Sequence, residues 1–121
     1  MKPKVLFVTE RWIDGDPRNY ESPYEACLIG PLESCGLGTA IRFYYDEYAS
    51  NHVPQSDSEV QSAIEGAILG EVEHSKPDLI VVTHILPWAN RAAMPEFYSQ
   101  ELQDIPVCMV WVESSPDVIR E

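Results

Sequence analysis

The chain has 121 residues, of which 45% are hydrophobic, and its 20 acidic and 8 basic side chains give a formal net charge of -12. This length supports one compact domain with its own core. The negative charge repels nucleic acid and anionic lipid surfaces, so we expect neither as a partner. No apolar run approaches the ~20 residues that span a bilayer, and the short apolar start is unlike a signal peptide. The sequence therefore predicts a cytoplasmic protein without a membrane span.

The cysteines Cys27, Cys35 and Cys108 are odd in number and lack the spacing of metal ligands. Each lies within an apolar pattern, which predicts buried, reduced thiols rather than a disulfide framework or a zinc site. We expect neither a metal nor a cofactor.

The first strand is predicted over residues 4–9, "KVLFVT", because a continuous apolar run is typical of a strand buried on both faces. A helix should follow, with Ser22 as its N-cap, a proline at the first helical position and Glu25 closing a capping box. Pro31 should kink this helix, and Gly36 or Gly38 should end it. The face of this helix that covers the sheet is predicted to hold Tyr24, Cys27, Leu28, Pro31, Leu32 and Cys35.

The rest of the chain continues the alternation of strands and helices. Residues 39–47 are rich in β-branched and aromatic side chains and predict the second strand. Residues 56–76 begin with a capping box and carry apolar residues at helical spacing. A buried strand is predicted at 79–85, a short helix at 95–102 and a fourth strand at 105–113.

This order predicts a three-layer α/β fold of the Rossmann or flavodoxin type, with a parallel sheet of about four strands and helices on both faces. Ligands of such sheets bind beyond the carboxyl ends of the strands, near the point where the strand order reverses. We expect that point to lie between the first and third strands.

Polar and aromatic residues follow each predicted strand, at 9–12, 46–47, 84–88 and 113–115. Their carboxylates, among them that of Glu113, can accept hydrogen bonds from sugars or amines or remove a proton. His84 can act as a general base near neutral pH, and Trp12 and Trp88 can stack on a sugar ring. The alternative is structural, since strand ends meet water and tryptophans often close loop edges.

Missing motifs exclude several classes of α/β domain, among them dinucleotide-binding and P-loop proteins. The first loop has no G-x-G-x-x-G, and no G-x-x-x-x-G-K-[ST] occurs in the chain. The acidic pair of a phosphoacceptor receiver domain and the D-x-H-x-x-G loop of a cobalamin-binding domain are also missing.

The chain resembles the N-terminal half of a GT-B-type glycosyltransferase, including the glycosyltransferase-like proteins related to spore-maturation enzymes. The segments that carry the resemblance are "KVLFVTERW", "SPYEACLIGPLESCG", "KPDLIVVT" and "IPVCMVWVESSPDVIRE". The second domain of that family, which binds the nucleotide-sugar, has no counterpart in these 121 residues. The resemblance implies a domain that holds a sugar or other small-molecule acceptor and is inactive without its C-terminal donor-binding domain.

The resemblance also implies roles for the residues at the predicted edge. Glu10 or His84 would be the catalytic base, and Arg11 would pair with an anionic acceptor or a donor phosphate. Trp12, Trp88 and Glu113 would complete the substrate-binding wall.

The segment "SSPDVIRE" reads as the start of a helix close to the last residue, which favours a piece of a longer two-domain chain. The competing hypothesis is a stand-alone flavodoxin-like module that binds a ligand or a partner without catalysis. An end of the sheet left uncovered would favour self-association into a homo-oligomer.

Overall fold

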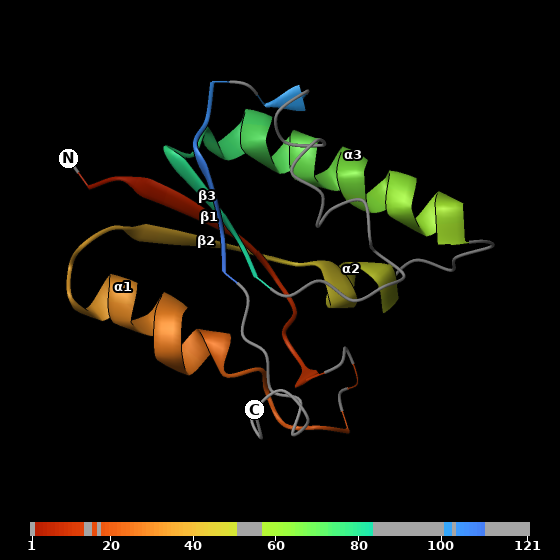
Figure 1. The fold of residues 1–121 in the computed structure, drawn as a ribbon, viewed down its shortest axis with the longest axis horizontal. Coiled ribbons are helices and arrows are strands. Elements are labelled where there is room, and N and C mark those ends of the chain that lie inside the picture. Colours follow the sequence, from red (N-terminus) through yellow and green to blue (C-terminus); the bar gives the residue numbers. More distant parts are fainter. Residues whose placement is uncertain are drawn as a thin grey trace, which may run out of the picture.

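The computed structural model describes residues 2–13, 16, 18–50, 57–83, 101–102 and 104–110. In order, the elements are β1 (Lys4–Thr9), the π-helix η2 (Glu25–Ile29), α1 (Gly30–Ser34), β2 (Thr39–Tyr44), α2 (Tyr45–Ser50), α3 (Asp57–Ser75), β3 (Leu79–Val82) and β4 (Val107–Met109). Helices lie between β1 and β2 and between β2 and β3, as the sequence predicted, whereas most of the segment between β3 and β4 lies outside the described residues (Figure 1).

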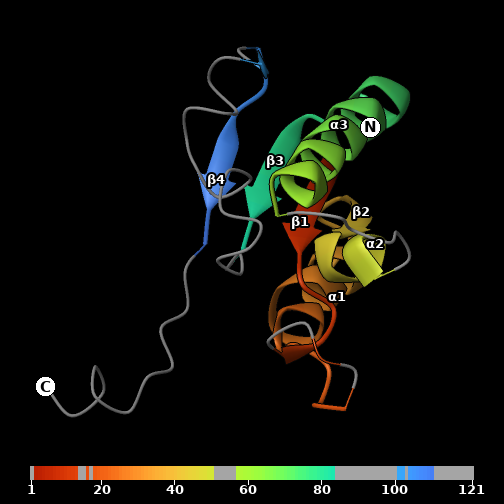
Figure 2. The same cartoon turned by 90° about the vertical axis from the view of Figure 1, so that its right-hand side faces the viewer.

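The four described strands form one parallel sheet in the order β2-β1-β3-β4 (Figure 2). Lys4 of β1 lies opposite Thr39 of β2, and Ile80 of β3 lies opposite Val107 of β4. The chain forms β2 on one side of β1 and later forms β3 on the other side of β1. The strand order therefore reverses between β1 and β3, which confirms both the α/β class and the predicted position of the switch point.

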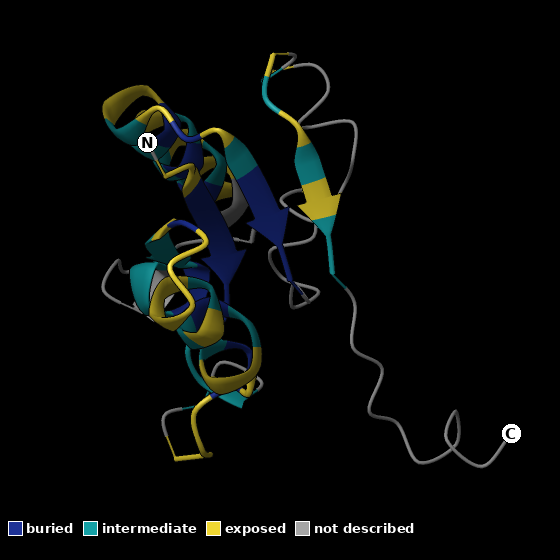
Figure 3. Ribbon diagram, turned by 90° about the vertical axis from the view of Figure 1, so that its left-hand side faces the viewer, coloured by how far each residue is buried: buried dark blue, intermediate teal, exposed yellow. Residues whose placement is uncertain are grey.

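Helices cover both faces of the sheet, because alternate residues of each buried strand point in opposite directions. The cluster on the α3 face contains Leu6, Val8, Tyr45, Ile64, Ile68, Val72, Ile80 and Val82. The cluster on the face of η2 and α1 contains Val5, Phe7, Ile29 and Val81. Burial of each large apolar side chain contributes about 1.5–3 kcal/mol, so these clusters hold the three layers together. Figure 3 shows β1 and β3 as the buried centre of the molecule.

The first helix differs from the sequence prediction at its start. The predicted capping box does not form, because no side chain caps the helix and Glu25 binds Arg42 instead. The backbone N–H of Gly30 donates to the carbonyl oxygen of Glu25, five residues earlier, which defines a π-helical turn. A Cβ at Gly30 would lie 2.9 Å from that same oxygen, so this turn favours glycine.

Pro31 lies at the junction between the π-helical turn and the regular helix α1. Proline cannot donate a hydrogen bond and clashes with the carbonyl four residues earlier in an α-helix, so a wider turn before it relieves the conflict. The helix ends as predicted at Gly36, which has a φ of 71°, and the N–H of Leu37 donates to the carbonyl of Leu32 at 3.1 Å.

The prediction that the cysteines are buried is wrong, because Cys27, Cys35 and Cys108 are all exposed. The π-helical turn places an extra residue in the helix and rotates the covering face, so Ile29 faces the core where Cys27 was expected. Cys108 lies on β4 between Val107 and Met109, which pack toward the α3 side.

The second strand ends at Tyr44 rather than at residue 47, because α2 begins at Tyr45. The ring of Tyr45 is fully buried in the α3 cluster, which turns the chain inward at this point. The predicted second helix is confirmed as α3. Residues 84 and 85 of the third predicted strand, 111–113 of the fourth and 95–100 of the predicted short helix lie outside the described residues.

Candidate functional site

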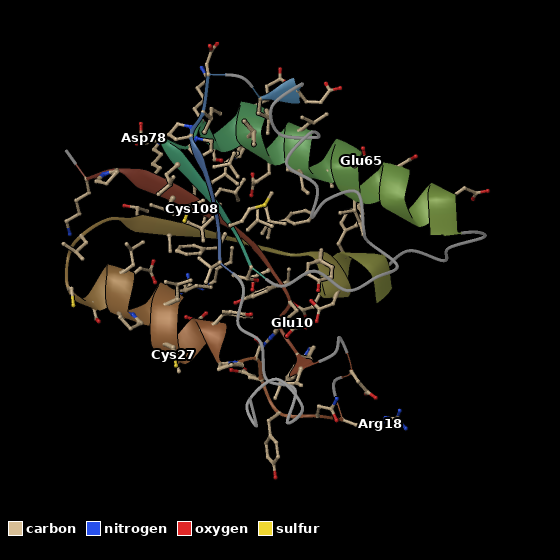
Figure 4. The ribbon with its side chains drawn as sticks, in the orientation of Figure 1. Glu10, Arg18, Cys27, Glu65, Asp78 and Cys108 are labelled. Atoms are coloured by element: carbon tan, nitrogen blue, oxygen red, sulfur yellow. The ribbon has the colours of Figure 1, made fainter. Side chains whose placement is uncertain are left out.

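Glu10, Arg11 and Trp12 follow β1 directly, at the carboxyl end of the sheet. Figure 4 shows Glu10 at the end of the sheet opposite Asp78, whose N–H binds the carbonyl of Lys4 at the start of β1. The end of the sheet at Glu10 is therefore the carboxyl end of the strands, where the sequence placed the candidate site. The other predicted site residues, His84, Trp88 and Glu113, lie outside the described residues.

The first loop is held in place by the buried carboxylate of Asp46 in α2. Asp46 Oδ1 accepts a hydrogen bond of 2.9 Å from the N–H of Arg11, and its Oδ2 accepts one of 3.0 Å from the N–H of Trp12. The N–H of Glu47 also donates to Oδ1, at 3.0 Å. The sequence predicted Asp46 at this edge of the sheet. In the structure, its carboxylate binds backbone N–H groups of the first loop.

The guanidinium of Arg11 is engaged within the protein. Its Nη1 donates to the two carboxylate oxygens of Glu47 at 3.2 and 3.0 Å, and these contacts raise the pKa of Arg11. The same group lies 5.0 Å from the ring centroid of Trp12 and 5.7 Å from that of Tyr44. Arg11 therefore joins the loop to both β2 and α2.

The loop returns alongside itself as a short antiparallel pair. Trp12 and Glu21 form an isolated bridge, and the N–H of Ser22 donates to the carbonyl of Arg11 at 2.8 Å. This pairing places Glu21 and Ser22 next to the end of β1. Neither position was predicted as part of a site.

Glu25 at the start of η2 is fixed by two residues of β2. Arg42 binds its carboxylate through Nε at 2.6 Å and Nη2 at 3.0 Å, and the hydroxyl of Tyr44 donates to it at 3.1 Å. The bonds from Arg42 hold the pKa of Glu25 below its ordinary value. Burial, together with the bond to Glu25, raises the pKa of Tyr44. Arg42 also binds Glu33 in α1 at 2.8 Å.

These segments enclose a polar pocket of about 140 Å³, which we call the β1–β2 pocket. Its wall consists of Glu10, Arg11, Glu21, Ser22, Glu25, Ile29 and Tyr44. Glu10 is 7% exposed and Ser22 is 4% exposed. The hydroxyl of Ser22 has no hydrogen-bond partner among the residues that the structure describes. From the sequence, Ser22 and Glu25 were interpreted as helix caps. Of the residues in the pocket wall, only Glu10 and Arg11 at the end of β1 were predicted as site residues.

At the switch point, two buried threonine side chains fill the gap between the ends of β1 and β3. Thr83 Oγ1 donates a hydrogen bond of 2.8 Å to Thr9 Oγ1, and both side chains are fully buried. This bond joins the ends of β3 and β1. Within the described part of the chain, the pocket lies beside β1 and β2, whereas the loops after β3 and β4 fall outside that part.

Comparison of the chain with protein families, with curated proteins and with solved structures finds no match. The described residues contain no helix that is both long and apolar enough to cross a membrane. The same residues hold no group of three or more histidine, cysteine, aspartate or glutamate side chains that could bind a metal ion.

Proposed function

We propose that this domain binds the acceptor of a sugar-transfer reaction in the β1–β2 pocket. The observation that carries the proposal is a buried carboxylate, Glu10, in the wall of a polar pocket just beyond a central strand. Parallel α/β sheets bind their ligands beyond the carboxyl ends of the strands. Carboxylates and hydroxyls in the wall can accept hydrogen bonds from the hydroxyl groups of a sugar.

In this function Glu10 is the general base. Its carboxylate takes the proton of an acceptor hydroxyl while that oxygen attacks the anomeric carbon of the donor, and the nucleotide leaves with the electrons of the broken bond. In the glycosyltransferases that the sequence resembles, the donor is held by a second domain. The roles of His84 as an alternative base and of Trp88 and Glu113 as wall residues remain predictions.

A second candidate function is ligand binding without catalysis. It is favoured by the internal contacts of Arg11, whose guanidinium binds Glu47 and packs over Trp12. These contacts give the Glu-Arg-Trp sequence a structural role in shaping the loop. A binding module would need the pocket but no general base.

Titration of the ¹⁵N-labelled protein with neutral monosaccharides, glucose among them, tests the binding step. We expect shifts of the amide signals of Glu10, Arg11 and Ser22, and Glu10→Gln should weaken binding by roughly fivefold through the loss of a hydrogen bond to a charged acceptor. Glu73→Gln, an exposed position on α3, is the matched control and should leave binding unchanged. No shifts at these amides with any neutral or amino sugar would overturn the proposal.

Catalysis and plain binding are separated by the same variant in the assembled transferase. As a general base, Glu10 contributes ~100-fold or more to the rate, so Glu10→Gln should lower kcat by that factor, which is far more than its roughly fivefold effect on acceptor affinity. A variant that changes affinity alone favours the binding module.

A further inference from the structure

The two edges of the sheet differ in how they are protected against the addition of another strand. Within the described residues, β2 and β4 each pair with one neighbour only and form the two edges (Figure 2). The backbone N–H of Ala40 points away from β1, because the N–H of Thr39 donates to the carbonyl of Pro3 on the β1 side. The carboxylate of Glu33 binds Arg42 of β2 at 2.8 Å, and Arg42 and the N–H of Ala40 together lower its pKa. Charged groups of this kind protect an edge strand.

The β4 edge carries no such charge. Residues 105–110 read IPVCMV and are all uncharged, in a chain whose formal net charge is -12. The N–H of Val110 donates to the carbonyl of Val82 on the β3 side at 2.8 Å. Successive residues of a strand alternate in the direction of their backbone groups, so the N–H and C=O groups of Val107 and Met109 point away from β3. This edge is therefore suited to pairing with a further strand.

The β4 edge is complementary to a second copy of itself. In an antiparallel pair, two residues that lie opposite each other exchange both of their backbone hydrogen bonds. A two-fold axis at Cys108, perpendicular to the sheet, places Val107 of each copy opposite Met109 of the other. Both outward N–H groups of each copy then find an acceptor, whereas a shift along β4 leaves some of them without one. Two-fold dimers are also the commonest homo-oligomers.

The side chains of β4 are compatible with this register. Val107 and Met109 pack toward the α3 cluster, so in the pair they contact each other across the axis and continue that apolar layer between the copies. Cys108 is exposed and lies between them in the strand. The two copies of Cys108 face each other at a position without backbone bonds between the strands, where opposite Cα atoms are about 4.5 Å apart. That separation allows a disulfide, so the thiol reports the register.

We propose that two copies of this chain join along their β4 edges, antiparallel and centred on Cys108, into one continuous sheet. The described β4 is only three residues long, and each copy is strongly negative. The dimer is therefore weak, with a dissociation constant of roughly 10 µM to 1 mM. This inference does not depend on a ligand in the β1–β2 pocket, so it goes beyond the proposed function and is tested separately from it.

Sedimentation equilibrium of the intact chain under reducing conditions, from about 1 mM to about 10 µM, tests the association. Cys108→Glu places two carboxylates opposite each other on the axis, so this variant should dimerise at least tenfold more weakly. Cys27→Glu adds the same charge at an exposed position on η2 and should change the dissociation constant less than twofold. Cys108→Ser should dimerise as the wild type does. A wild-type monomer at every concentration would overturn the inference.

Met109→Pro is a second variant, aimed at the backbone. The N–H of Met109 points away from β3, and proline is tolerated at such positions of an edge strand, so circular dichroism should show a retained fold. This variant should also dimerise at least tenfold more weakly. Raising NaCl from roughly 50 mM to roughly 500 mM should strengthen the wild-type dimer, because salt screens the repulsion between two negative copies. A dimer that salt dissociates, or that Cys108→Glu leaves intact, would overturn the inference.

Amide hydrogen exchange identifies the strand that covers the edge. In the proposed dimer, the protection of the Val107 and Met109 amides rises with protein concentration, whereas that of Cys108, whose N–H faces β3, stays constant. Protection of all three amides in a monomer would mean that another segment of the same chain pairs with β4, and would overturn the inference. Fast exchange at Val107 and Met109 at every concentration would overturn it as well.

Oxidative cross-linking tests the register. The variant Cys27→Ser/Cys35→Ser keeps Cys108 as its only thiol. Diamide takes one hydrogen atom from each of two Cys108 thiols, an S–S bond forms between the copies, and the diamide is reduced to the hydrazine. We expect a disulfide-linked dimer on a non-reducing gel, and far less of it from the control Cys35→Ser/Cys108→Ser, which keeps only Cys27. Association without a Cys108 cross-link would overturn the proposed register and the inference with it.

Discussion

The backbone N–H of Arg11 donates a hydrogen bond of 2.9 Å to the carboxylate of Asp46, which lies 35 residues further along the chain. The same buried carboxylate binds the next N–H of the loop. The shape of the loop beyond β1 is therefore set by a residue beyond β2, and the pocket depends on that contact.

Replacing Asp46 with Ala should destabilise the fold strongly. The change removes three hydrogen bonds to a charged acceptor and leaves the N–H groups of Arg11, Trp12 and Glu47 without it. A buried N–H group without an acceptor costs about 1–3 kcal/mol. These three N–H groups are only partly buried, so water can replace part of each bond, and we expect a loss of about 2–4 kcal/mol in the free energy of unfolding. Urea unfolding followed by circular dichroism measures it. Glu73→Ala on α3 is the control, and a similar loss in both variants would contradict a special role for Asp46.

The hydroxyl pair between β1 and β3 predicts an asymmetric pair of mutational effects. Thr83 donates to Thr9, and Thr9 in turn lies 3.2 Å from the carbonyl of Glu10. Thr83→Val removes one bond and should cost about 1 kcal/mol, whereas Thr9→Val also leaves the buried Thr83 hydroxyl without its acceptor and should cost about 2 kcal/mol.

A double-mutant cycle tests this pair, because valine has nearly the same shape as threonine. The double variant Thr9→Val/Thr83→Val should lose less stability than the sum of the single variants, since it removes both hydroxyls of the pair and leaves neither one without its partner. Simple additivity of the two losses would show that the hydroxyls do not interact in solution.

The ion pair between Glu25 and Arg42 predicts a loss of stability in acid. The pKa of Glu25 is lowered in the folded protein, chiefly by its hydrogen bonds from Arg42, so the unfolded chain binds a proton more readily. The stabilisation is fully present above the ordinary glutamate value of about 4.3 and is lost as the pH falls through the lower, folded value. The urea midpoint of the wild type should therefore fall more steeply below about pH 4 than that of Glu25→Gln. Parallel curves for the two proteins would contradict the prediction.

The sequence predicted β1 accurately, because a run buried on both faces is continuous and has no competing helical pattern. The end of β2 was missed at Tyr44 and Tyr45, since aromatic residues suit a strand and a buried helical turn equally well. Only the packing of Tyr45 against α3 decides between these two structures.

The sequence placed Glu10 and Arg11 correctly at the edge of the sheet, because topology alone determines that position, and their role in a site stays a prediction. Parallel strands bring their carboxyl ends to one edge, so Glu10 and Asp46 could be placed together. The positions of Ser22 and Glu25 could not be predicted, because their local pattern also fits a capping box. Arg42, which is 17 residues from Glu25, supplies two charged hydrogen bonds that outweigh the cap.

The purified 121-residue protein should neither transfer sugar from a nucleotide-sugar nor hydrolyse one. The sequence lacks a glycine-rich turn that could cradle a diphosphate, and the net charge of -12 disfavours an anionic donor. Chromatographic detection of released nucleotide measures turnover. Activity that persists through purification and disappears in Glu10→Gln would contradict the prediction, because it would require a donor site within this chain.

Replacing Ser22 with Ala should make the folded protein more stable. The serine hydroxyl is buried without a partner among the described residues, so its removal should relieve a desolvation cost and raise the free energy of unfolding by about 1 kcal/mol. Urea unfolding followed by circular dichroism measures the effect.

Ser34→Ala is the matched control, because Ser34 is exposed on α1 and its hydroxyl has only a long contact of 3.4 Å to the carbonyl of Pro31. It should leave the free energy of unfolding nearly unchanged. A Ser22→Ala variant that loses stability would mean that the hydroxyl supports the start of the helix after all.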